Sequence, residues 1–217
     1  MTSFPGSPRL VKGGIVLIDP ETSAITRIIA LQYNPDTLSR TLQAKSTSKE
    51  GGDRSEPLRL SGPPVETLKI EAAIDATDQL AMADPVTIRV GIQPQLAALE
   101  MLIYPTTNQL SAVNSLANRG TLEIAPMEGP LTLFIWNRNR IMPVRITEFS
   151  ITEEAFDTNL NPIRAKVSLG MRVLSVDDLG FNHRGSSIYM SYQQNKEKFS
   201  AIFSNNTFNN LGIENIP

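Results

Sequence analysis

Alternation of hydrophobic and polar positions predicts that most of this chain forms β-strands. The clearest case is residues 65–76, where every second position from Leu68 to Ile74 is apolar, as in a half-buried strand. Residues 141–156 and 162–175 alternate on either side of the turn-like sequence DTNLN, which predicts a long antiparallel pair. Shorter runs predict further strands in residues 9–19, 25–33, 38–47, 120–126 and 130–137.

One internal stretch follows the helical period instead. Within residues 91–105, apolar side chains recur at intervals of three and four, at Ile92, Leu96, Leu99 and Ile103. Pro94 suits a first helical turn, and Pro105 lies just beyond the last apolar position. We therefore expect a helix within residues 92–104.

A second helix is expected near the C-terminus, over residues 186–203. Ser186 or Ser187 suits the N-cap position. One face of the helix carries the apolar stripe formed by Ile188, Tyr192, Phe199 and Phe203.

These elements predict a mainly β (β+α) fold, an antiparallel β-barrel or sandwich with one packed helix and a C-terminal helical extension. Residues 1–9 contain proline and glycine and are expected to form a flexible arm. The β domain is expected over residues 10–176. Residues 177–217 are expected to form a linker, the amphipathic helix and an extended tail.

The sequence LQYNPDTLSR, residues 31–40, interrupts an apolar run at Asn34-Pro35. A residue before proline is driven out of the helical region, and an asparagine side chain can bond its own downstream backbone. We therefore expect this stretch to end one strand and to turn the chain into the next. It requires no catalytic role.

Composition excludes several classes of protein. Twenty Lys and Arg against 22 Asp and Glu leave a net charge of −2, which argues against a protein that binds nucleic acid by neutralising phosphates. The chain has no cysteine, so disulfides, thiolate catalysis and Cys-ligated metals are excluded. It has neither a signal-peptide pattern nor an apolar run long enough to span a membrane. We expect a protein of the cytoplasm that inserts into no membrane, or one that leaves by another route.

Residues suited to catalysis are few. The single histidine, His183, is expected to be an ordinary loop residue. Glu153-Glu154 and Asp177-Asp178 are adjacent pairs, and neighbours on a strand point to opposite faces, so neither pair forms an acid–base dyad. No metal-ligand run occurs. We expect no catalytic, cofactor or metal site, and no enzymatic activity.

Four stretches, taken in order, resemble the tube-type domain of contractile injection systems. They are LQYNPDTLSR, PPVETLKIEAAIDATDQL, GIQPQLAALEMLIYP and NPIRAKVSLGMRVL. The resemblance implies a β-barrel related to phage tail-tube and type VI secretion tube proteins, assembled as six-fold rings. Many members carry a LysM module after this domain, whereas this chain continues with a short loop and an amphipathic helix.

The resemblance implies a structural subunit that forms a ring at the base of the inner tube, as tube initiator or baseplate adaptor joining tube to hub or baseplate. The main inner-tube subunit is an alternative. A glycan-binding or lytic baseplate component is an alternative of another class. The partners implied are further copies of the chain, in a six-fold ring, and the tube, hub-spike and baseplate proteins of one phage tail-like particle. That particle is assembled in the cytoplasm and is either membrane-anchored or released by lysis.

Two segments are predicted interfaces. The resemblance implies that the long polar loop, residues 46–64, reaches the neighbouring subunit or the ring below. There the basic residues Lys45, Lys49, Arg54 and Arg59 would meet the acidic residues Glu66, Glu71 and Asp75 of another copy. A solvated loop is the alternative. The stripe on the C-terminal helix is expected to dock onto an adjacent ring or hub protein, and packing on its own domain is the alternative.

Overall fold

The computed structural model describes residues 10–19, 22–45, 60–118, 129–203 and 212. The described residues contain seven strands: β1 (Gly14–Ile18), β2 (Ile25–Ala30), β3 (Leu38–Gln43), β4 (Val65–Asp75), β5 (Leu131–Asn137), β6 (Arg140–Phe156) and β7 (Pro162–Val173). They also contain six helices: α1 (Thr77–Ala81), α2 (Pro85–Val90), α3 (Gln93–Glu100), α4 (Thr107–Asn118), α5 (Val176–Leu179) and α6 (Arg184–Ile202). The predicted strand at 120–126 lies outside the described residues.

All seven strands belong to one antiparallel sheet, in the order β2-β1-β5-β6-β7-β4-β3. The predicted β+α class is confirmed. The sheet is not closed into a barrel, however, because β2 and β3 lie at its two ends and do not pair with each other. The sheet is therefore open. The sequence pattern had allowed a barrel, because alternation along each strand does not show whether the two outer strands pair.

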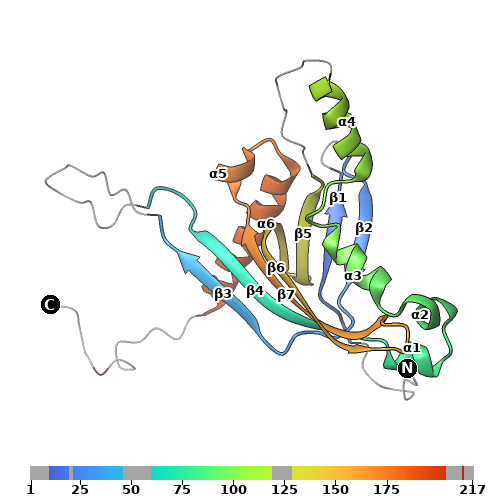
Figure 1. Cartoon of the computed structure of the whole chain (residues 1–217). Helices are drawn as coiled ribbons and strands as arrows, with labels where there is room; N and C mark the ends of the chain where they lie inside the picture. Colours follow the sequence, from blue (N-terminus) through green and yellow to red (C-terminus); the bar gives the residue numbers. More distant parts are fainter. Residues whose placement is uncertain (1–9, 20–21, 46–59, 119–128, 204–211, 213–217) are drawn as a thin grey trace, which may run out of the picture.

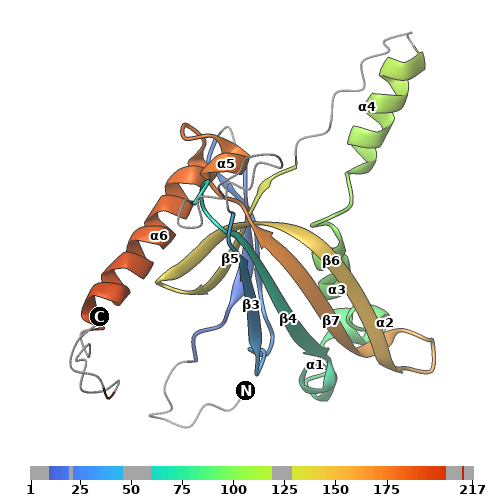
Figure 2. The same cartoon turned by 90° about the vertical axis from the view of Figure 1, so that its left-hand side faces the viewer.

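The sheet bends at its longest strand, β6, which has 17 residues. The first part of β6 pairs with β5, and the part beyond Arg145 pairs with β7 alone. Register shifts between Ile146 and Glu148 and between Glu153 and Ala155 add twist to the strand. As a result β6 curves from one half of the sheet to the other (Figure 2).

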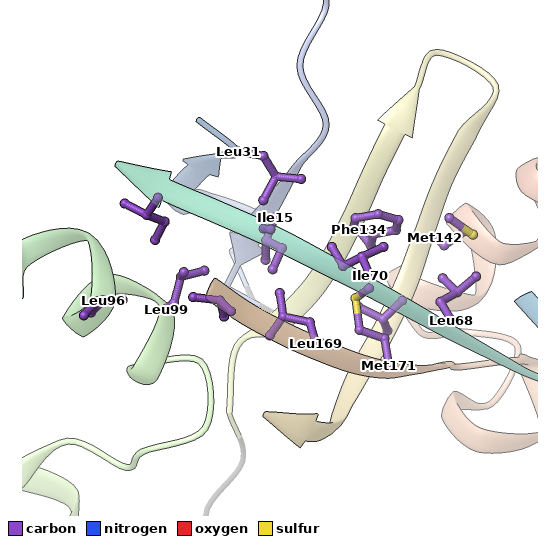
Figure 3. Packing of buried hydrophobic residues seen from close by; sticks show 14 of the residues in the cluster. Ile15, Leu31, Leu68, Ile70, Leu96, Leu99, Phe134, Met142, Leu169 and Met171 are labelled. Carbon is purple, nitrogen blue, oxygen red and sulfur yellow. The ribbon is translucent and has the colours of Figure 1, made fainter. Parts of the chain in front are cut away.

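The core lies between the two halves of the bent sheet. Ile15 of β1 and Phe134 of β5 pack in one cluster with Ile70 of β4 and Met171 of β7 (Figure 3). Leu99 of α3 joins the same cluster from the side. A smaller cluster joins β1 and β5 to α5 and α6; its members are Val16, Ile18, Leu131 and Leu133, with Leu179 and Ile188 packed against them.

The segment between β4 and β5 is more helical than the sequence pattern predicted. The helix expected within residues 92–104 is present as α3, while α1, α2 and α4 were not predicted. Capping signals mark two of these helices. Asp84 caps α2 by accepting a hydrogen bond from the Thr87 backbone N–H at 2.8 Å, and Pro85 follows as the first residue. Thr106 and Gln109 exchange side-chain to backbone hydrogen bonds at the start of α4.

Gly91, at the end of α2, packs closely against Pro162 at the start of β7. Its backbone has φ 59° and ψ −136°, a conformation that side chains disfavour. A Cβ atom there would lie 2.1 Å from the carbonyl oxygen of Pro162. That same oxygen accepts a hydrogen bond from the Ile92 N–H at 2.9 Å. Only glycine allows this close approach.

The Asn34-Pro35 break ends a strand as predicted, although its hydrogen bonds differ. The Asn34 side chain accepts from the Gly13 N–H at 3.0 Å and donates to the Val11 carbonyl oxygen at 2.9 Å. The prediction that it bonds its own downstream backbone was therefore wrong. The side chain instead fastens the turn to the segment that leads into β1.

The C-terminal helix begins at Arg184, two residues earlier than expected, and its N-cap is His183. The His183 Nδ1 accepts a hydrogen bond from the Gly185 N–H at 3.0 Å. The predicted cap, Ser186 or Ser187, was wrong because both residues lie within the helix, where the buried Ser186 hydroxyl donates to the Gly180 carbonyl oxygen at 2.5 Å. In place of the expected linker the chain forms α5, which begins with a Ser175–Asp178 capping box.

Candidate functional site: a polar sheet face with open edges

The half of the sheet formed by β6, β7, β4 and β3 has two different faces. Along β4, residues alternate strictly between buried and exposed, and β7 alternates over most of its length. The buried side chains join the core. The outward face carries polar, charged and small side chains: Thr67, Lys69, Glu71 and Ala73 of β4, Arg164, Lys166, Ser168 and Gly170 of β7, and Glu148, Ser150 and Thr152 of β6, as the cross-strand register shows. This face is open to solvent over β4, where those four residues are all exposed.

Opposite charges on neighbouring strands pair across this face. The Lys166 Nζ lies 2.8 Å from a Glu154 carboxylate oxygen, and the hydrogen bond to Glu154 raises the pKa of Lys166. The Lys69 Nζ lies 3.8 Å from a Glu148 oxygen. Exposed pairs of this kind contribute little to stability. Their effect is to leave the face hydrophilic without an excess of either charge.

Both edges of this half-sheet lack a strand partner among the described residues. On one side β3 pairs only with β4, and five of its six residues are exposed. On the other side, the part of β6 from Glu148 to Phe156 pairs only with β7. Unpaired edges present rows of free backbone N–H and C=O groups to any strand that fits. These two edges are the strongest candidates for contact between subunits.

A buried carboxylate holds α6 to this half of the sheet. Glu66 of β4 is only 3% exposed, because it follows the alternation that buries every second residue of that strand. Its carboxylate accepts a hydrogen bond from the Tyr192 hydroxyl at 2.8 Å and from the Lys196 Nζ at 3.0 Å. Arg40 of β3 approaches the same carboxylate, with Nε at 3.7 Å. We call Glu66, Tyr192, Lys196 and Arg40 the Glu66 cluster.

The cluster shows how burial and charge act together. The Lys196 ammonium also lies 3.9 Å from the centre of the Tyr192 ring, a cation–π contact. Burial, followed by the hydrogen bond to Glu66, raises the pKa of Tyr192 to about 12. Tyr192 therefore stays protonated at neutral pH, and its hydroxyl donates a hydrogen bond to the Glu66 carboxylate. The prediction that Glu66 meets a basic loop of another subunit was wrong, because its partners lie in its own chain.

The predicted stripe on the C-terminal helix divides into two parts. Tyr192 is 3% exposed and belongs to the core, and Ile188 packs against the smaller cluster. Phe199 and Phe203 are 54% and 72% exposed. The buried face of α6 is rotated relative to the prediction, since Ser186 and Tyr189 are on it. The first half of the helix packs on its own domain, and the end of the stripe is left uncovered by the described residues.

The four basic residues predicted to form the loop interface fall into two groups. Lys45 forms an ion pair with Asp177, with Nζ 2.9 Å from a carboxylate oxygen, so this lysine ties the end of β3 to α5. Lys49, Arg54 and Arg59 lie outside the described residues. Sequence reasoning missed the Glu66 cluster. The signal was present in the strand alternation, which placed Glu66 in phase with Leu68 and Ile70.

The residues considered for chemistry have structural partners. His183 caps α6, Asp178 pairs with Arg172 at 2.7 Å, and Glu154 pairs with Lys166. Within the described ranges, no group of three or more His, Asp or Glu side chains is placed to hold a metal ion. Across the same ranges, no helix combines the length and hydropathy needed to cross a membrane.

No protein-family model matches the chain, and no curated protein matches it. Among solved structures, one similar chain comes from a structure described as "Tail of empty GTA particle computed with helical refinement, C6 symmetry". The two chains are 16% identical, with a TM-score of 0.28, over 75% of this chain and 90% of the other. A TM-score this low does not establish a common fold.

Proposed function

We propose that this protein is a structural subunit of a contractile injection system, forming a ring at the base of the inner tube, where it joins the tube to the hub or baseplate. The observation that carries the proposal is the half-sheet β6-β7-β4-β3, with a polar outward face and an unpaired edge on each side. The sequence resemblance described above supports the same assignment and supplies the six-fold symmetry. The main inner-tube subunit is the runner-up, since it needs the same ring.

Copies of the half-sheet can join without changing their strand direction. Neighbouring strands alternate in direction from β6 through β7 and β4 to β3. The β3 strand of one copy therefore runs antiparallel to β6 when a second copy is placed beside it in the same orientation. Repetition of this contact closes a ring and removes every unpaired edge of the half-sheet. The polar faces then line the channel, and the core sides face outward.

Charge disfavours the alternative pairing of two β6 edges. The free part of β6 carries Glu148, Glu153 and Glu154. Unlike charges on facing strands favour pairing, and like charges oppose it. A contact between two β6 edges would bring the glutamates together, so the β3–β6 contact is preferred.

The exposed end of α6 gives the ring a surface for other proteins. Phe199 and Phe203 lie beyond the part of the helix that is packed on its own domain. We assign this end to the contact with an adjacent ring or hub protein, within a phage tail-like particle. The basic residues of the loop, Lys49, Arg54 and Arg59, remain proposed contacts with a neighbouring subunit.

The ring is tested by adding charge at the two edges. Thr41 of β3 and Thr152 of β6 both lie on the polar face. We expect the purified wild-type chain to form closed rings in light scattering and negative-stain microscopy. Thr41→Glu and Thr152→Glu should each abolish closed rings with an unchanged melting temperature, because each places a glutamate at the contact while touching no buried residue.

The matched control is Thr67→Glu. Thr67 is exposed on the same face, but it lies on β4, between β3 and β7. This variant should still form rings. A wild-type chain that stays monomeric at every concentration, or a control that dissociates as much as the edge variants, would overturn the proposed edge pairing.

We propose no enzymatic activity for this protein. The glutamates considered for a lytic role are neighbours on β6, where Glu153 lies opposite the buried Ala165 and Glu154 pairs with Lys166 of the polar face. A glycosidase needs two carboxyl groups that face one substrate. Incubation of the purified chain with peptidoglycan should release no soluble fragments. Release that Glu153→Gln or Glu154→Gln abolishes would establish the lytic alternative.

A further inference from the structure

Helix α4 is a second surface that the described part of the chain leaves uncovered. None of its 12 residues is buried, and both views show it extending away from the sheet (Figure 1, Figure 2). A lone helix of this length is only marginally stable in water. The hydrogen bonds between Thr106 and Gln109 support its first turn, but no residue of α4 is buried by the described part of the chain, so a partner surface would stabilise it.

One face of α4 is apolar. At about 100° per residue, Leu110, Val113, Leu116 and Ala117 fall on the same side, and the opposite side carries Asn108, Ser111 and Ser115. Leu110 and Leu116 are exposed. The helix contains no charged residue, so nothing on it opposes burial in an apolar groove.

The protein also has a mainly apolar groove that can take such a helix. The groove, of about 480 Å³, lies between β2, α3 and the end of β4 and is lined mostly by apolar and small side chains. Its walls include Ile28 and Ala30 of β2 and Ala98 and Leu99 of α3, and its one charged lining residue is Arg27. Ile28 is 66% exposed. The groove therefore presents apolar surface to solvent, as the helix does.

The backbone of β2 adds hydrogen-bonding groups to this groove. The Leu31 N–H donates to the Gly13 carbonyl oxygen at 2.9 Å, and the register continues with Gly14 opposite Ala30 and Ile15 opposite Ile29. Because inward and outward positions alternate along an antiparallel edge, the backbone groups of Ile28 and Ala30 point away from β1.

We propose that α4 of one copy lies in the β2–α3 groove of a second copy. The short connection of residues 101–106 turns α4 away from the groove of its own chain. Each copy then offers one helix and one groove, which is a head-to-tail contact that continues from copy to copy. The contact deepens the proposed ring assembly, yet it uses no residue of β3 or β6. The two contacts can therefore fail separately.

The test uses the full-length double variant Thr41→Glu/Thr152→Glu as background, so that pairing of sheet edges is already blocked. We expect this background to self-associate in sedimentation equilibrium. Adding Leu110→Asp/Leu116→Asp, or adding Ala98→Glu in the groove, should each raise the dissociation constant by about 100-fold or more, because each buries unpaired charge at the contact.

Two controls match these changes. Ser111→Asp/Ser115→Asp places the same side chains on the polar face of α4, and Ala97→Glu lies beside Ala98 on an exposed position of α3. Both should self-associate like the background. Equal loss in the controls would show a general effect of charge or of helix propensity, and would overturn the proposal.

The most discriminating experiment mixes two proteins: the helix variant, Leu110→Asp/Leu116→Asp, and the groove variant, Ala98→Glu, each on the same background. The helix variant keeps an intact groove, and the groove variant keeps an intact α4. Neither should associate alone, but together they should form a 1:1 complex that grows no larger. A background that remains monomeric, or a mixture that forms no complex, would overturn the contact. A monomeric background whose melting temperature falls with Leu110→Asp/Leu116→Asp would show that α4 is covered by its own chain.

Discussion

Removal of one hydroxyl group tests how α6 is held to the sheet. Tyr192→Phe deletes the hydroxyl that donates to Glu66 at 2.8 Å and accepts from Arg40 at 3.4 Å, and it leaves the ion pairs of Glu66 with Lys196 and Arg40 in place. A hydrogen bond to a charged group contributes about 1.5–3 kcal/mol. For a domain of this size that corresponds to a fall in melting temperature of about 3–12 °C. Thermal unfolding followed by circular dichroism at pH 7 measures the loss.

The same variant carries a pH signature. The folded-state pKa of Tyr192 is raised to about 12, from an ordinary value of 10.0, so the folded chain holds this proton more tightly than the unfolded chain. The resulting stability, about 3 kcal/mol, is fully present below pH 10 and is lost as the pH rises from about 10 to 12. The difference in unfolding free energy between wild type and Tyr192→Phe should therefore shrink over that range.

The control is Tyr104→Phe, at an exposed tyrosine. It should change the unfolding free energy by less than about 0.5 kcal/mol. The reasoning would be refuted if Tyr192→Phe unfolded like the wild type at pH 7. It would also be refuted if the gap between the two stayed constant up to pH 11.5.

Four further predictions concern the fold and the interfaces. Gly91→Ala should lower the unfolding free energy by about 3 kcal/mol or more, measured by urea titration, since the new Cβ would meet the Pro162 carbonyl oxygen; an unchanged midpoint would contradict the close approach. Truncation before Ser186 should lower the melting temperature by more than about 10 °C, because it removes buried residues of the core; an unchanged value would show that α6 belongs to a partner. Phe199→Ser/Phe203→Ser should leave the melting temperature unchanged and abolish incorporation into particles, whereas normal incorporation would remove α6 from the hub contact. Deletion of residues 48–60 should leave a folded monomer that joins no ring, and normal assembly would show that the loop is no interface.

The strands were predictable because burial acts on every second residue. In β4 and β7 the alternation identified both the strand and its core-facing side, and the β6–β7 pair followed from the turn between them. Long-range organisation left no such local signal. Whether β2 pairs with β3 to close the sheet depends on the bend of β6. That bend depends on register shifts for which no residue type is a reliable sequence signal.

The helices show a similar division. The apolar period of α3 could be recognised in the sequence, while the six-residue α2 and the uncharged α4 are marked mainly by their caps, Asp84 and Thr106. The Asp84-Pro85 pair and the Thr106–Gln109 spacing were the available signals. In α6 the four apolar residues suggested one face. The structure buries a different face of the helix, because the buried Glu66 carboxylate binds Tyr192 and Lys196 and so fixes which side of α6 lies against the sheet.

Electron cryo-microscopy of the assembled chain tests the central claim most directly. The account predicts a closed ring in which β3 of each subunit runs antiparallel to the free part of β6 of the next, with Lys69, Glu71 and Lys166 facing the channel. A ring or particle in which both of these edges stay unpaired, or in which this polar face points outward, would contradict it.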